Sequence, residues 1–210
     1  MKKLLRRYFL FAVLALLFTQ AAFGGTILFL GDSLTAGQGV EEGQAFPALI
    51  EEKIQAQHLP YEVVNAGLSG DTSAGGLRRI DWLLQRPIDV LVLELGANDG
   101  LRGLPVAAMK ANLQAIIDKV KAKNPQVKII IAGMEMPPNL GGDYANDFRA
   151  VFADLARTNN ATLIPFLLEG VGGHTDLNQR DQIHPTADGH KIVAENVWRV
   201  LAPILEKNGS

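Results

Sequence analysis

Residues 26–33 have the sequence TILFLGDS, in which an uncharged, largely apolar run ends at a glycine and two polar residues. A short continuous run of this kind, bounded by turn residues, is typical of a strand that is covered on both faces, as in a parallel sheet. Four later stretches have the same character. The sequence therefore predicts five strands, at residues 26–30, 62–65, 90–95, 128–132 and 162–165.

Longer stretches of helical period separate these runs and predict helices at residues 46–57, 73–85, 105–123, 144–158 and 186–206. Pro105 suits the first turn of its helix, and Thr186 suits the cap of the last one. Strands that alternate with helices form a parallel sheet with helices on both faces. We predict an α/β fold, a three-layer α/β/α sandwich around a five-stranded, flavodoxin-like doubly wound sheet. Ligands of such sheets bind beyond the carboxyl ends of the strands, so the loops after the strands are expected to carry the function.

The first 24 residues follow a different pattern. Four basic residues at positions 2–7 precede an apolar run at 8–18, and the small residues of Ala22-Phe23-Gly24 follow. This layout predicts a signal peptide at 1–24, because the apolar run is too short to span a bilayer. An uncleaved anchor and a buried helix are the alternatives, and the Arg6-Arg7 pair leaves the export route open. We expect an exported protein, periplasmic or secreted, with a single domain at 25–210.

Composition excludes several classes of chemistry. The chain has 210 residues and no cysteine, which removes a thiol nucleophile, a cysteine-ligated zinc site and an iron–sulfur cluster. The predicted signal peptide holds 4 of the 20 basic residues and none of the 22 acidic ones, so its removal leaves a net charge of −6. A protein of that sign is a poor binder of nucleic acid, and we expect no nucleic-acid partner.

The first candidate loop is Gly31-Asp32-Ser33-Leu34, directly after the first predicted strand. A serine at a turn between a strand and a helix can present its hydroxyl at the sheet edge and its backbone N–H to a ligand. These residues alone fit an N-capping turn at least as well. The loop also lacks the Gly-x-Ser-x-Gly pattern of ordinary α/β-hydrolases.

Two further loops carry candidate donors for a developing negative charge. Gly70, in the loop 65–72, leaves its backbone N–H unshielded, which suits close approach to an oxyanion. Asn98, in the loop 96–100, can aim a neutral amide donor at the same kind of group. The alternatives are a positive-φ turn at Gly70 and a turn formed by Asn-Asp-Gly at 98–100.

The fourth candidate pairs a carboxylate with an imidazole, because Asp181 and His184 are three residues apart. One turn can carry both, so that Asp181 fixes the orientation and tautomer of the ring. Pro185 biases His184 away from helical geometry and onto a loop. A surface ion pair and two ligands of a metal are the alternatives. We expect no metal site, because the other histidines form no evident ligand cluster with this pair: His58, His174 and His190.

In this order, the four motifs together resemble the SGNH (GDSL-type) hydrolases. The blocks that carry the resemblance are Gly31-Asp32-Ser33, Gly70-Asp71, Gly96-Ala97-Asn98-Asp99 and Asp181-x-x-His184. The stretches at 94–103 and 136–141 look closer still to the bacterial periplasmic thioesterase I, lysophospholipase and arylesterase branch. The resemblance spans essentially all of the predicted mature chain.

The resemblance implies a serine esterase that hydrolyses carboxylic ester and thioester bonds through an acyl-serine intermediate, with no cofactor. It implies Ser33 as the nucleophile, His184 as general base and then acid, and Asp181 as the group that orients the ring. It also implies an oxyanion hole made of the Ser33 and Gly70 backbone N–H groups and the Asn98 side chain.

The sequence says less about the substrate than about the catalytic residues. We expect the segments 134–144 and 101–106 to form apolar walls around an acyl chain, although ordinary packing explains such residues equally well. The candidate substrate-binding residues are Leu101, Leu104, Met134 and Met136. The expected partner is a small-molecule ester, thioester or lysophospholipid. We expect no stable membrane anchor after cleavage of the signal peptide, and a monomer.

Three other functions stay open at this point. One is a carbohydrate O-acetyl esterase of the same fold. Another is a metal-dependent phosphoesterase that uses Asp32, Asp99 and Asp181. The third is a non-catalytic binding protein, which the sequence disfavours because every motif position carries a chemically competent residue type.

Overall fold

The computed structural model describes residues 24–136 and 141–208. The predicted signal peptide lies outside these residues apart from Gly24, and so does part of one predicted acyl wall, at 137–140. Among the described residues, no helix combines the length and apolarity needed to cross a bilayer.

A parallel sheet of five strands forms the centre of the molecule, in the order β2-β1-β3-β4-β5. This is the flavodoxin-like order, so the predicted fold is confirmed. The strands are β1 (Gly25–Gly31), β2 (Tyr61–Gly67), β3 (Val90–Glu94), β4 (Lys128–Ala132) and β5 (Thr162–Ile164). Gly31 pairs in register with Gly67 of β2 and with Glu94 of β3. The loops that follow these three strands therefore begin side by side at one edge of the sheet.

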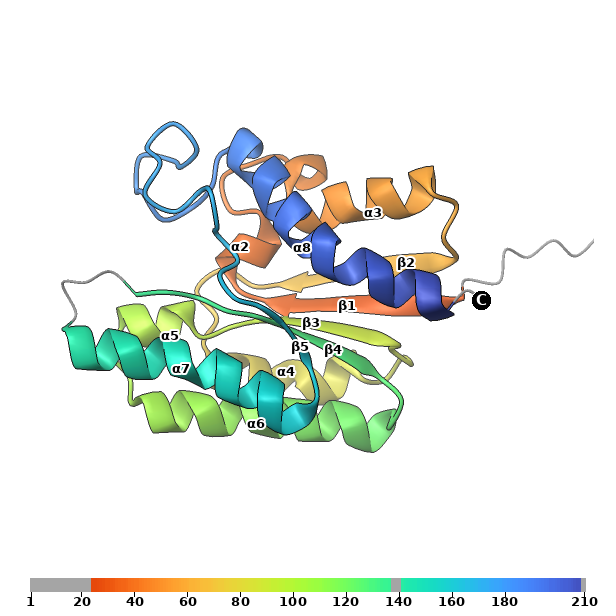
Figure 1. The fold of residues 1–210 in the computed structure, drawn as a ribbon, viewed down its shortest axis with the longest axis horizontal. Coiled ribbons are helices and arrows are strands. Elements are labelled where there is room, and N and C mark those ends of the chain that lie inside the picture. Colours follow the sequence, from red (N-terminus) through yellow and green to blue (C-terminus); the bar gives the residue numbers. More distant parts are fainter. Residues whose placement is uncertain (1–23, 137–140, 209–210) are drawn as a thin grey trace, which may run out of the picture.

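Helices cover both faces of the sheet. Figure 1 shows α3 (Phe46–Ala56) and α8 (Ala187–Asn208) on one side and α4 (Ser73–Leu83), α6 (Val106–Lys123) and α7 (Gly142–Asn159) on the other. Thr186 caps α8 as predicted, since its Oγ1 accepts a hydrogen bond from the Gly189 N–H at 3.3 Å. Pro105 is the N-cap of α6 and not a residue of its first turn.

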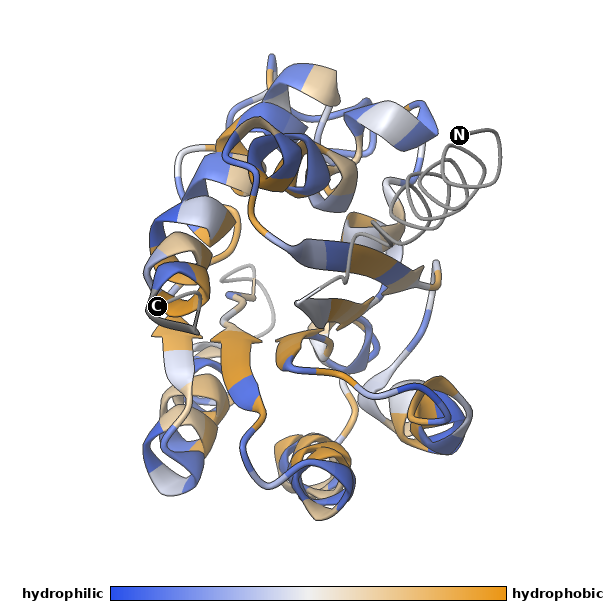
Figure 2. Cartoon of the chain, turned by 90° about the vertical axis from the view of Figure 1, so that its right-hand side faces the viewer, coloured by the Kyte–Doolittle hydropathy of each residue, from blue (hydrophilic) through white to orange (hydrophobic). Residues whose placement is uncertain are grey.

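The core fills the space between the layers. Figure 2 shows hydrophobic residues concentrated in the strands, whereas the helices mix hydrophobic and hydrophilic residues. On the α3 side, Phe29 of β1 packs edge-on against Phe46, with ring centroids 5.7 Å apart. On the other side, Phe148 and Phe152 of α7 pack in the same way at 5.3 Å. Each large side chain buried like these stabilises the fold by about 1.5–3 kcal/mol, which gives the loops at the sheet edge a rigid support.

The sequence did not predict three short elements: α2 (Ser33–Ala36), the 3₁₀-helix η1 (Glu42–Gln44) and α5 (Ala97–Leu101). Each is too short to show helical periodicity. The N-capping turn considered for the first motif is nevertheless present, because the Asp32 side chain accepts a hydrogen bond from the Leu34 N–H at 3.0 Å. Asn98 lies in α5, and not on a loop as expected.

Candidate active site

Ser33 lies where β1 passes into α2, as the first residue of that helix. Its Oγ is 2.9 Å from Nε2 of His184, which belongs to the segment between β5 and α8. The two residues are 151 positions apart in the chain. The structure thus brings together the serine and the histidine that the sequence analysis singled out separately.

Asp181 completes this arrangement on the other side of the ring. Its Oδ2 is 2.6 Å from Nδ1 of His184, and its Oδ1 accepts hydrogen bonds from the backbone N–H groups of Ile183 and His184, both at 3.0 Å. The hydrogen bond from the His184 ring, followed by the two backbone bonds, lowers the pKa of Asp181 to about 2. Because this carboxylate is ionised at neutral pH, it selects the tautomer with the proton on Nδ1, and Nε2 is left to accept the Ser33 hydroxyl proton.

The segment that carries His184 is held in place by two amide side chains that the sequence analysis missed. Gln179 donates from its backbone N–H to the His184 carbonyl at 2.7 Å, and its Nε2 donates to the Pro185 carbonyl at 2.9 Å. Asn178, which is buried, donates to the Val171 carbonyl at 2.7 Å. An amide five or six positions from a histidine is a weak signal in a sequence, because its partners are backbone groups that only the fold reveals.

Asn98 lines the same cavity as Ser33, and its amide is bonded to Asp71, the residue after Gly70. Gly70 has a φ of +79°, a left-handed conformation that favours glycine. In the described part of the chain, the backbone N–H groups of Ser33 and Gly70 have no hydrogen-bond acceptor. The Asn98 amide donates to Oδ2 of Asp32 and to the carbonyl of Asp71, each at 3.0 Å. Asn98 therefore ties the Ser33 turn to the Gly70 loop, since each acceptor is the chain neighbour of one of the two free donors.

Arg79 of α4 forms hydrogen bonds with the same edge of the sheet. The sequence analysis did not identify this residue. Its Nε donates to Asp71 at 2.7 Å, and its two terminal nitrogens donate to the carbonyls of Ala66 and Gly31 at 2.7 and 2.9 Å. One guanidinium thus fixes the ends of β1 and β2 and the residue after Gly70. The fixed fork of arginine suits such a set of acceptors.

A cavity of about 580 Å³ opens onto the Ser33, Asn98 and His184 side chains. Most of its exposed lining is apolar. The apolar side chains that line it are Leu34, Ala97, Leu101, Met134, Met136, Phe166, Leu168 and Ile183. Three of the four predicted substrate-binding residues are in this set, but Leu104 is not. Leu104 is not among the residues that line this cavity, and its carbonyl accepts a hydrogen bond from the Tyr144 hydroxyl at 2.9 Å.

The sequence matches the GDSL-like lipase/acylhydrolase family over residues 29–192, a range that contains the serine, the donors, the aspartate and the histidine. The chain belongs to this family. Esterase TesA of Pseudomonas aeruginosa is 41% identical over 191 residues, which cover 90% of this chain and 94% of TesA. Thioesterase 1/protease 1/lysophospholipase L1 of Escherichia coli K12 is 39% identical, with coverages of 93% and 92%.

Solved structures agree with this assignment. The crystal structure of TesA superposes with a TM-score of 0.81 at 40% identity and covers 85% of this chain and 98% of its own. The psychrotrophic esterase EstA from Pseudoalteromonas, inhibited by monoethylphosphonate, gives a TM-score of 0.81 at 34% identity, with coverages of 87% and 99%. The resemblance seen in the sequence is confirmed, and the chain is an SGNH (GDSL-type) hydrolase.

Two carboxyl groups of this GDSL-family chain lie buried beneath Ser33. Asp32 and Glu94 are 1% and 2% exposed. Burial raises the pKa of Asp32 to about 6. Burial and the neighbouring charge of Asp32 raise the pKa of Glu94 well above its ordinary value. Desolvation disfavours the charged form of such groups, and two carboxylates at one site disfavour each other.

The carboxylates of the phosphoesterase alternative do not converge on one point. Asp99 accepts hydrogen bonds from the Ser73 N–H and hydroxyl at 2.8 and 2.6 Å, whereas Asp181 is paired with His184. Across residues 24–136 and 141–208, no three acidic or histidine side chains are arranged to hold a metal ion. The geometry therefore gives that alternative no support.

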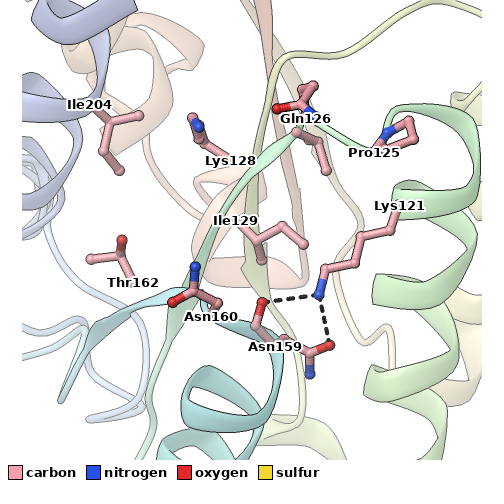
Figure 3. A pocket seen from close by; sticks show the side chains of 10 residues that line it. Lys121, Pro125, Gln126, Lys128, Ile129, Asn159, Asn160, Thr162 and Ile204 are labelled. Atoms are coloured by element: carbon pink, nitrogen blue, oxygen red, sulfur yellow. Dashed lines mark hydrogen bonds between the residues drawn. The ribbon is translucent and has the colours of Figure 1, made fainter.

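A second cavity, of about 420 Å³, lies at the opposite edge of the sheet, where β4 and β5 begin. Figure 3 shows Lys121 reaching across it to Asn159, whose carbonyl and Oδ1 accept hydrogen bonds from Nζ at 2.9 and 3.1 Å. Its lining contains no histidine or carboxylate that would activate a hydroxyl. The cavity beside Ser33 is the one that joins an apolar surface to a nucleophile and a base.

Proposed function

We propose that Ser33 is the nucleophile of this ester hydrolase, that His184 is its general base and acid, and that Asp181 orients the imidazole. The observation that carries the proposal is the continuous chain of contacts from the Ser33 hydroxyl through the ring to Asp181, at 2.9 and 2.6 Å. A nucleophile bonded to a base that a third group orients is the arrangement that activates a hydroxyl.

Reaction proceeds in two halves. His184 Nε2 takes the Ser33 hydroxyl proton while Oγ attacks the acyl carbon, and the carbonyl oxygen becomes an oxyanion. His184 then gives this proton to the departing alcohol or thiol, which leaves an acyl-serine. In the second half, His184 takes a proton from water, the hydroxide attacks the acyl carbon, and the proton returns to Ser33 Oγ as the acid is released. Asp181 stays ionised throughout and stabilises the protonated ring.

The oxyanion is bound by the backbone N–H groups of Ser33 and Gly70 and by the Asn98 amide. The first two donors have no competing acceptor in the described residues, so they are ready before charge develops. Both hydrogens of the Asn98 amide are already used, by Asp32 and by the Asp71 carbonyl. Asn98 therefore exchanges one of these partners for the oxyanion during the reaction.

The acyl group lies in the cavity of about 580 Å³, whose mostly apolar lining suits a hydrocarbon chain better than a sugar or a phosphate. Leu101, Met134 and Met136 contribute one part of this lining, and Phe166, Leu168 and Ile183 contribute another. The substrate is a small-molecule ester, thioester or lysophospholipid. All of the site residues come from one chain, which is consistent with a functional monomer.

The protein acts outside the cytoplasm. A signal peptide at 1–24 delivers a single domain at 25–210, and the basic-then-apolar pattern of the first 24 residues supports this proposal.

A panel of p-nitrophenyl esters of increasing chain length, acyl thioesters, lysophospholipids and acetylated sugars, assayed on the wild type and on Ser33→Ala, tests these roles. We expect turnover of apolar acyl esters that Ser33→Ala abolishes, and covalent labelling of Ser33 by a fluorophosphonate. Full activity in Ser33→Ala would refute the nucleophile, and a strong preference for acetylated sugars would favour the carbohydrate O-acetyl esterase.

A further inference from the structure

Glu94 is buried at the end of β3, directly beside the turn that carries Ser33. Its Oε2 accepts hydrogen bonds from the Asp32 backbone N–H at 3.1 Å and from the Thr35 hydroxyl at 2.8 Å. A side chain at Gly31 would put its Cβ within 2.5 Å of the same oxygen. Only glycine at that position lets the carboxyl group approach the turn so closely.

Asp32 links this carboxyl group to the donors of the site. Its backbone N–H donates to Glu94, and the carboxyl groups of both residues are buried, while its Oδ1 accepts from the Leu34 N–H and its Oδ2 from the Asn98 amide, both at 3.0 Å. Two buried carboxylates at one site disfavour each other, which favours a proton on one of them. The contacts thus run from Glu94 through Asp32 to the first turn of α2 and to Asn98.

The charged groups around this pair come from three elements. The imidazole of His184, from the segment before α8, partly opposes the rise that burial causes in the pKa of Asp32. The guanidinium of Arg79, from α4, donates to the Gly31 carbonyl one residue before Asp32. Asp71, after β2, is paired with that guanidinium at 2.7 Å. No cation pairs directly with Glu94 in the described residues, so nothing compensates a second negative charge there.

We propose that Glu94 works as a neutral carboxylic acid that shares its proton with Asp32, and that this acid pair positions the Ser33 turn and the Asn98 amide. The pair keeps a single negative charge beneath the place where the oxyanion forms, because a second one would repel the transition state at close range and in a low dielectric. Glu94 is thus a positioning residue. The proposal rests on the roles proposed for Ser33 and Asn98.

The direction in which the pKa of Glu94 is shifted agrees with this assignment. Burial and the charge on Asp32 raise the pKa of Glu94 well above its ordinary value, although Thr35 and the Asp32 N–H oppose the shift. Two interacting acids lose their protons stepwise, so the first ionisation places one charge on the pair and makes the second harder. The pair therefore holds one proton at neutral pH.

Infrared difference spectroscopy tests the protonation state directly. At about pH 8, where free carboxyl groups are ionised, the wild type is expected to show the C=O stretching band of a neutral carboxylic acid, and Glu94→Gln is expected to lack it. Glu62→Gln is the matched control, because Glu62 lies on the neighbouring strand β2 and is paired with Arg86 at 2.8 Å. Absence of the band from the wild type, or its persistence in Glu94→Gln, would overturn the proposal.

Kinetics test the positioning role. Glu94→Gln keeps an acceptor for the Asp32 N–H and a donor for the Asp32 carboxylate, so most of kcat should be retained. Glu94→Leu removes both, and we expect kcat to fall by about 10²-fold with little change in KM, the size of effect that misplacement by about 1 Å produces. Thr35→Val removes one of the donors to Glu94 and should give a smaller loss.

Two kinetic outcomes would overturn the idea: an unchanged kcat in a folded Glu94→Leu, or a loss in Glu94→Gln as large as in Glu94→Leu. Far-UV and near-UV circular dichroism verify that each variant is folded. If Glu94→Leu does not fold, Glu94→Gln still tests the proposal, because glutamine has nearly the same shape as glutamate. Activity that survives Ser33→Ala would refute the proposed nucleophile instead, so the two failures can be told apart.

Discussion

Replacement of His190 by phenylalanine is expected to make the protein more resistant to acid. His190 lies on α8 with 1% of its surface exposed, stacked on Phe46 with ring centroids 6.3 Å apart. Its Nδ1 accepts a hydrogen bond from the Phe46 N–H at 3.3 Å, so the ring proton is on Nε2, which has no hydrogen-bond partner among the residues that the structure describes. Burial, with a smaller contribution from His184, lowers the pKa of His190 to about 4. The predicted helix at 186–206 includes His190, but the sequence analysis did not predict that its ring is buried.

The sign of the effect follows from proton binding. Between a pKa of about 4 in the folded state and about 6.5 in the unfolded state, the unfolded chain binds more protons, so stability falls as the pH falls. The free-energy loss at His190 amounts to about 2 kcal/mol between about pH 7.5 and 5, and about 3 kcal/mol at its limit. Asp32 works in the opposite direction, because its folded-state pKa of about 6 is raised and its protonation stabilises the fold in acid. The wild-type curve alone would therefore hide the contribution of His190.

The measurement is urea unfolding of the wild type and of His190→Phe at about pH 7.5 and pH 5, followed by circular dichroism. The contribution of Asp32 cancels in the difference between the two proteins at each pH. We expect this difference to change by about 2 kcal/mol in favour of His190→Phe on going to the lower pH. A difference that does not change with pH would refute the assignment of a buried, neutral imidazole at this position.

Three further predictions concern activity. Asn98→Ala should lower kcat by about 10²–10³-fold, as expected for the loss of one oxyanion donor, and a kcat close to that of the wild type would remove Asn98 from this role. Asp181→Asn should lower kcat by about 10⁴-fold, because the amide no longer selects the proton on Nδ1 of His184; steady-state assays with intact folding check this, and a loss of less than about tenfold would contradict it. Leu101→Trp should shift the preference toward shorter acyl chains in a p-nitrophenyl ester series, whereas Leu104→Trp, outside the cavity, should leave it unchanged; equal effects of the two substitutions would count against the acyl site.

The fold was predictable because a strand that is buried on both faces has a short, continuous run of apolar residues, which is easily seen in a sequence. The runs at 90–95 and 128–132 are almost wholly apolar, and their positions in the structure match the predicted ones to within one residue. The alternation of the strands with helices also indicated that the strands run parallel. The two helices at the site, α2 and α5, escaped prediction because four or five residues cannot display a 3.6-residue period.

The contacts among Ser33, His184 and Asp181 were predictable for a different reason. Asp181 and His184 are close in sequence, so one turn defines their geometry, and Ser33 follows a strand whose end must lie at the carboxyl edge. The part of the cavity formed by the segment between β5 and α8 has no comparable signal in the sequence. Phe166 and Ile183 belong to the long segment between β5 and α8, whose path is set by contacts such as the backbone hydrogen bond from Gln179 to His184 and not by periodicity.

The most useful signal that was overlooked is an acid at the end of an otherwise apolar strand. Glu94 follows four apolar residues of β3, a place where a charged side chain is costly unless it is neutralised or bonded. Asp181, in contrast, has a side chain that is 43% exposed and three hydrogen bonds that favour its charged form. The two carboxyl groups of one site are thereby driven to opposite protonation states by their surroundings, which is a common basis for dividing acid and base roles. As the pH falls toward 6, Asp32 gains a proton well before Asp181 does. A loss of activity near this pH should therefore report on the contact between Asp32 and Asn98, and not on the group that orients the ring.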